Sequence, residues 1–254
     1  MPKFNHKKKQ NSRWPLAVGL LFFLAFAFLV FIIFKVATVD KFIYVNKTEA
    51  GDAEIIIVDS KQSRIIKYLI PFETELDSAR GYGKYKISSL WTLSEKNNNG
   101  KLISETIAKN LFLPVYLWKN EVKSNLNIYQ KIRVFFNKSN KNIDLEINST
   151  KLPNSVLIQF VNPEFIEIIP KIEVEDLTNS LNTLDKVSNI IEVAGGKITS
   201  NSRGYDADLD CEIYGKKLEV VNIFSNIFSC NSSVDETLST DLKIRLGAKF
   251  SERF

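Results

Sequence analysis

Histidine and cysteine are scarce in this chain of 254 residues, which has one histidine and two cysteines. The histidine, His6, comes before a long apolar segment. The chain beyond that segment therefore cannot build a Ser-His-Asp or Cys-His catalytic site. A zinc site is excluded there too, because zinc needs histidine or cysteine ligands. We expect no metal and no other cofactor.

Charge is absent from Pro15 to Phe34, a run of twenty residues. At about 1.5 Å per residue, a helix of this length spans the roughly 30 Å hydrocarbon core of a bilayer. The run follows five basic residues, Lys3, Lys7, Lys8, Lys9 and Arg13. Their excess over the basic residues beyond the run predicts a cytoplasmic N-terminus. We therefore expect a cytoplasmic basic leader at 1–13, a transmembrane signal-anchor helix at 14–39, and extracytoplasmic domains after it, in a single-pass cell-membrane protein.

Two alternatives for this apolar run are a cleaved signal peptide and a buried core helix. A signal peptide has an apolar stretch of about 7 to 15 residues, followed by a small-x-small cleavage site. Here Ala25-Phe26-Ala27 lies in the middle of the run, and Lys35 stands at its exit. These positions favour the uncleaved anchor.

The net charge of +5 is concentrated at the N-terminus. Of the 34 Lys and Arg residues, five lie in the leader and one is Lys35, which leaves 28 against 29 Asp and Glu. The part beyond the anchor has therefore no positive excess with which to neutralise phosphates. We expect no nucleic-acid partner.

Residues 50–165 have the pattern of a small mixed α/β domain. The β-branched runs Glu54–Asp59 and Arg64–Ile70 flank a polar turn and predict a hairpin. Helices are predicted at Lys84–Glu95, at Lys101–Phe112 and within Ser124–Phe136, and further strands at Val115–Trp118, Ile143–Ile147 and Val156–Val161.

Residues 170–254 have a clearer periodicity. Lys171–Glu175 alternates as a strand, and a helical face from Leu181 to Ile191 ends at Gly195-Gly196. Further strands at residues 197–202, 209–214 and 241–246 and a helix at 218–228 complete the order β-α-β-β-α-β. The predicted fold class is α/β (α+β), with one N-terminal transmembrane helix followed by two small mixed α/β domains.

The C-terminal region resembles the LytR C-terminal domain, on the residues Ile172-Glu173-Val174, Gly195-Gly196 and the stretch from Asp241 to Gly247. Residues 50–165 are similar to the front of the catalytic domain of the LytR-CpsA-Psr family. That similarity is carried by the stretch from Ile70 to Thr74, by Gly83 to Lys86, and by Leu111 to Val115.

The resemblance implies transfer of a lipid-pyrophosphate-linked glycan onto the bacterial cell wall. The family uses arginines, acidic residues and a divalent metal, which suit the charge of a pyrophosphate. This chain departs from the motif, because Phe72 stands where the family has arginine and Glu73 where it has aspartate. We therefore assign no catalytic residue.

The predicted function is a noncatalytic binding or scaffolding module in cell-wall assembly. Its partners would be the membrane and a cell-wall glycan, a lipid-linked precursor or envelope proteins. The alternative is a glycan phosphotransferase with a rearranged site, which would have to gather Arg64, Arg80 and Arg133, the three arginines of the first domain.

Three short motifs can be interpreted either as ligand-binding sites or as ordinary turns and loops. Glu73, Glu75, Asp77 and Arg80 could form a weak metal or phosphate site or a solvated turn, and we favour the turn. Gly81-Tyr82-Gly83 has too few glycines for a phosphate-binding loop and predicts a tight turn. The aspartates at 206, 208 and 210 resemble part of a calcium loop, but its glycine and distal glutamate are missing.

Cys211 and Cys230 both fall in the second domain. Outside the cytoplasm, an even number of cysteines favours a disulfide. Two buried free thiols are the alternative.

Overall fold

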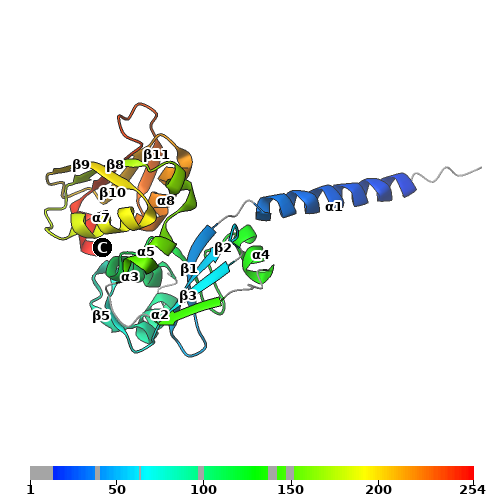
Figure 1. Cartoon of the computed structure of the whole chain (residues 1–254), viewed down its shortest axis with the longest axis horizontal. Helices are drawn as coiled ribbons and strands as arrows, with labels where there is room; N and C mark the ends of the chain where they lie inside the picture. The colour runs from blue at the N-terminus through cyan, green and yellow to red at the C-terminus, as the bar shows by residue number, and fades with distance from the viewer. Residues whose placement is uncertain (1–13, 38–40, 63, 97–99, 137–141, 147–151) are drawn as a thin grey trace, which may run out of the picture.

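A computed structural model describes residues 14–37, 41–62, 64–96, 100–136, 142–146 and 152–254. Residues 1–13 and the end of the expected anchor, 38–39, lie outside them. The first described element is α1 (Trp14–Ala37), a single helix that extends away from the rest and contacts α4 (Ile128–Phe136) (Figure 1). Within the described residues, no helix is long and apolar enough to cross a membrane.

The first sheet has five strands in the order β6-β1-β2-β3-β7. They are β1 (Lys41–Lys47), β2 (Ala53–Asp59), β3 (Arg64–Ile70), β6 (Leu117–Lys119) and β7 (Asn142–Glu146). The first three form an antiparallel meander, and β6 and β7 add parallel strands at its two edges. The predicted hairpin is confirmed, with Asp59 opposite Arg64.

Helices cover both faces of this sheet (Figure 1). On one face, Ile55 and Ile57 of β2 pack with Trp91 of α2 (Ile87–Lys96) and Ile103 of α3 (Lys101–Leu111). On the other face, the buried cluster contains Phe42, Tyr44, Ile56 and Val58, and Val134 of α4 packs against it. Because both faces are buried, the centre of β2, from Ile55 to Val58, is continuously apolar instead of alternating.

The helix predicted from Lys84 is wrong over its first turn. Residues Lys84–Lys86 form β5, which pairs with β4 (Glu75–Asp77), and α2 begins only at Ile87. Glu75 lies opposite Lys86 and Asp77 opposite Lys84, so opposite charges face each other across the small hairpin. Such cross-strand pairs stabilise strands.

The strand predicted at Val156–Val161 is also wrong. This segment forms α5 (Asn154–Leu157) and a 3-10 helix, η2 (Ile158–Phe160), and α6 (Pro163–Glu167) follows. Val156, Leu157 and Phe160 pack together against the first core, a helical spacing that an alternating strand could not provide. These short helices connect the two sheets.

Strand β1 was missed, and it begins ahead of residue 50, where the first domain was expected to start. It lies inside the sheet, between β6 and β2. Its run of aromatic and β-branched residues from Phe42 to Val45 is the sequence signal that could have identified it.

The second sheet has the order β11-β10-β12-β8-β9. Its strands are β8 (Lys171–Asp176), β9 (Lys197–Arg203), β10 (Cys211–Gly215), β11 (Asn231–Val234) and β12 (Leu242–Leu246). Helices α7 (Thr183–Ala194) and α8 (Leu218–Phe228) join parallel pairs, and α9 (Ala248–Arg253) follows β12. The predicted order is present with two additions, β11 and α9.

The glycine predicted to end the first helix of this domain does so, since Gly195 caps α7 with φ of 101°. One face of the sheet packs on α7 and α8, and its core includes a cluster of phenylalanines. The other face carries ion pairs, in which Arg245 lies 2.8 Å from Glu175 and 2.7 Å from Glu212. The domain has therefore two layers.

Candidate functional site

The acidic loop after Pro71 is neutralised by lysines. Glu73 forms an ion pair with Lys86, and Asp77 lies 2.7 Å from Lys109. Phe72 is 41% exposed beside them. In the described part of the chain, no three or more His, Cys, Asp or Glu residues gather to hold a metal. The favoured interpretation of this segment, a solvated turn, holds only around Glu73, because Glu75–Asp77 form strand β4 and Arg80 pairs with the buried Glu105.

The three arginines of the first domain each have a partner within the chain: Arg64 with Asp59 at 3.3 Å, Arg133 with Ser60 Oγ at 2.8 Å, and Arg80 with Glu105 at 2.8 Å. Asp59 and Ser60 are neighbours at the β2–β3 turn, whereas Glu105 belongs to α3. The arginines are thus divided between two places.

The aspartates of the suggested calcium loop do not converge either. Asp206 Oδ1 accepts hydrogen bonds from the backbone N–H of Asp208 and Leu209, at 3.0 and 3.1 Å. Asp210 pairs with Arg253 at 2.8 Å. Asp206 therefore stabilises the conformation of its own loop, and Asp210 forms an ion pair with the C-terminal helix α9.

Cys211 and Cys230 are bonded, with an S–S distance of 2.02 Å. The bond connects the start of β10 to the residue before β11. Arg253 Nη2 lies 3.1 Å from Cys211 Sγ and donates to the carbonyl oxygen of Phe228 at 3.0 Å. The disulfide is thus held against the C-terminal helix.

Next to Cys230, the two domains meet at a buried carboxylate. Glu105 accepts hydrogen bonds from Arg80 Nε at 2.8 Å and from Ser229 Oγ at 3.0 Å. The hydrogen bond to Glu105 raises the pKa of the Arg80 guanidinium. Arg80 and Ser229 both have positive φ, 65° and 54°, a conformation that costs free energy outside glycine. We infer that their shared partner holds both residues in place.

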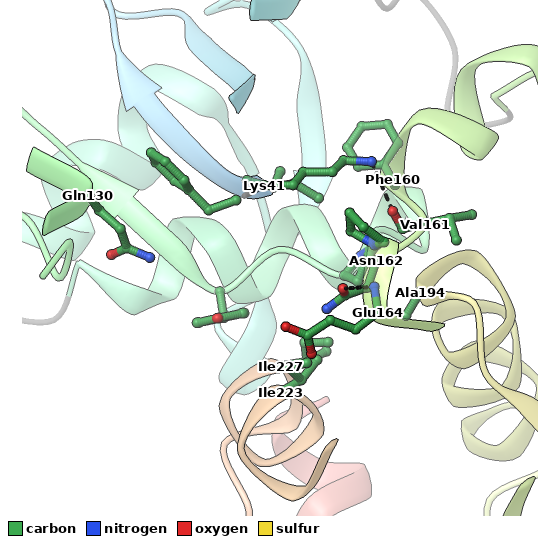
Figure 2. Close-up of a pocket in the computed structure, with 14 residues that line it drawn as sticks. Lys41, Gln130, Phe160, Val161, Asn162, Glu164, Ala194, Ile223 and Ile227 are labelled. Atoms are coloured by element: carbon green, nitrogen blue, oxygen red, sulfur yellow. Dashed lines mark hydrogen bonds between the residues drawn. The ribbon is translucent and has the colours of Figure 1, made fainter. Parts of the chain in front are cut away.

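A cavity of about 270 Å³ lies between the domains, and we call it the interdomain cavity. Both domains line it: Lys41, Gln130 and Phe160 belong to the first domain and its linker, and Ile223 and Ile227 to α8 (Figure 2). Sequence reasoning missed this site, because its residues come from segments far apart in the chain.

Lys41 provides the positive charge of the interdomain cavity. Its Nζ donates to the carbonyl oxygen of Val161 at 2.8 Å, as Figure 2 shows. Burial lowers the pKa of Lys41 to about 8; the nearby charge of Asp59 opposes this shift, and that of Arg64 adds to it. In mildly alkaline solution, Lys41 is therefore neutral in a substantial share of the molecules.

The segment after Val161 adds Asn162 and Glu164 to the lining of the interdomain cavity. Asn162 Oδ1 accepts the backbone N–H of Glu164 at 3.0 Å and thereby caps α6, with Pro163 in its first turn. Burial, followed by the charge of Glu164, raises the pKa of Tyr116 in the same wall. One cation, one carboxylate and an apolar wall suit the binding of a small amphipathic molecule.

Replacing Lys41 with methionine should remove a pH dependence of stability. The folded chain releases this proton near pH 8 and the unfolded chain near 10.5. Between these values the unfolded state binds more protons, so the contribution of Lys41 to the free energy of unfolding rises with pH. In urea unfolding, wild type should gain stability relative to Lys41→Met from pH 8 to pH 10.5. An equal difference at both values would contradict the burial of a charged lysine.

Comparisons of the chain with protein-family models, with curated proteins and with solved structures gave no match.

Proposed function

We propose that the chain is a single-pass cell-envelope protein related to the LytR-CpsA-Psr family. It acts as a noncatalytic binding or scaffolding module in cell-wall assembly, with its N-terminus in the cytoplasm and both α/β domains outside. Residues 50–165 correspond to a degenerate catalytic domain, and 170–254 to a LytR C-terminal domain.

The proposed membrane anchor rests on the uncharged run Pro15–Phe34, which falls within the single helix α1. Large apolar side chains on this helix are exposed, including Leu21 at 70% and Phe23 at 67%. Contiguous apolar surface of this kind is unfavourable in water and favourable in hydrocarbon.

The absence of catalysis is proposed mainly on the separation of the arginines. A pyrophosphate clamp needs several guanidinium groups that converge on one ligand. Here Arg80 pairs with Glu105 at the domain contact, while the other two arginines have partners at the β2–β3 turn. Phe72, at the position of the family's arginine, offers neither charge nor side-chain donor.

The test is binding of an isoprenoid pyrophosphate to the full chain, extracted with detergent from washed membranes. We expect the chain in the membrane fraction and no saturable binding, with or without magnesium, because no arginine cluster is available. Calorimetry measures the binding.

Saturable binding that is lost in Arg64→Ala and Arg133→Ala chains would instead support the glycan phosphotransferase. Recovery of the chain in the wash would contradict the anchor. The two results are independent, so location and catalysis are tested separately.

A further inference from the structure

A second cavity, of about 310 Å³, lies on the first domain away from the domain contact. We call it the tryptophan cavity, because Trp91 of α2 and Trp118 of β6 both line it. Its volume is at the small end of ligand cavities, which start at about 300 Å³. Aromatic walls of this kind bind flat apolar faces of a ligand.

Both indole nitrogens lack a hydrogen-bond partner among the described residues. Trp91 is only 1% exposed, so its Nε1–H has lost water without gaining an acceptor. A buried donor without an acceptor is unfavourable. Because no hydrogen bond fixes either ring, a small rotation toward a bound acceptor would lower the free energy of the complex.

The main chain at Gly100 lies against Trp118. A methyl group added at Gly100 would lie 2.2 Å from Cζ2 of that indole, far inside van der Waals contact. Gly100 also lines the tryptophan cavity. The Trp118 ring can therefore occupy its position only because residue 100 has no side chain. A substitution at Gly100 would displace the ring without removing a polar group.

Charges at the rim of the tryptophan cavity balance. Lys47 Nζ lies 3.0 Å from Glu95 Oε1, and Glu121 and Lys123 line the same cavity. Two positive and two negative groups favour an uncharged ligand over an ion. An ammonium and a carboxylate side by side suit neighbouring hydroxyl groups, since a hydroxyl both accepts and donates.

We propose that the tryptophan cavity binds an uncharged pyranose sugar, with a face of the ring on the partly exposed indole of Trp118 and its hydroxyls at the Lys47–Glu95 pair. The inference rests on the proposed function, for which it names a ligand class and a site. A nucleobase would satisfy the aromatic wall, but it has no neighbouring hydroxyls for the ion pair.

Tryptophan fluorescence tests this assignment directly. The chain has three tryptophans, so a Trp14→Phe chain reports only on Trp91 and Trp118. We expect a saturable change of its emission on titration with tri-N-acetylchitotriose. Gly100→Ala, which displaces Trp118, should weaken binding about tenfold. Glu95→Gln should weaken it several-fold, because it removes the negative charge of the ion pair and replaces one carboxylate oxygen, an acceptor, with an amide group that donates.

The matched control is Glu73→Gln, which removes the acid of another exposed Lys–Glu pair and should leave sugar binding unchanged. The proposal is overturned if the emission of the Trp14→Phe chain shows no saturable change on titration with the sugar. It is also overturned by equal binding in Gly100→Ala, or by an equal response to adenine, which has the aromatic face without hydroxyls. A chain that stays in membranes without binding sugar would refute this inference alone. Sugar binding by a chain recovered in the membrane wash would contradict the proposed location alone.

Discussion

Replacing Phe224 with alanine should lower the free energy of unfolding by about 3–5 kcal/mol. Phe224 is fully buried on α8, and its ring stacks on Phe165 and Phe228 at centroid distances of 5.6 and 6.3 Å. Phe165 belongs to α6, so the substitution opens a cavity between the linker and the second domain. Urea unfolding of the full chain measures the loss.

The control for this prediction is Leu218→Ala on the same helix. Leu218 is 60% exposed, and its truncation should change the free energy of unfolding by less than about 0.5 kcal/mol. Equal losses for the two variants would show that Phe224 does not lie in a packed core.

Loss of the disulfide should have the second largest effect. Serine at both Cys211 and Cys230 should cost about 3 kcal/mol, because the bond closes a loop with a sequence separation of 19 residues and restricts the unfolded chain. The measurement is the urea midpoint without reductant.

Reductant provides the comparison for this second prediction. Wild type with reductant should match the double serine variant, whose midpoint should not change when reductant is added. Two titratable thiols in unreduced, denatured wild type would contradict the bond.

The parts of the fold that were predictable have strong local signals. The β2–β3 hairpin follows from two β-branched runs around a polar turn, and the end of α7 follows from a glycine that adopts positive φ. Strand β5 has no such signal, because its pairing with β4 depends on charges seven and eleven residues away in the chain. Between Val156 and Val161, the apolar residues fit a short strand or a helix equally well, and packing on the first core decides for the helix.

The candidate sites were less predictable than the fold. Sequence reasoning examined clusters that are close in the chain, such as Glu73 to Asp77, and the structure pairs these acids with separate lysines. Both cavities instead join distant segments: Lys41 with Ile227 in one, Trp91 with Trp118 in the other. The cysteine pairing was accessible because the chain has only two cysteines.

The position of β1 has a mechanical consequence. Only three residues separate α1 from β1, and β1 is bonded to β2 on one side and to β6 on the other. A pull on the proposed anchor therefore enters the domain along the length of an interior strand. Its inter-strand hydrogen bonds then share the load in shear, and the domain should resist tension better than one whose edge strand could be peeled off bond by bond.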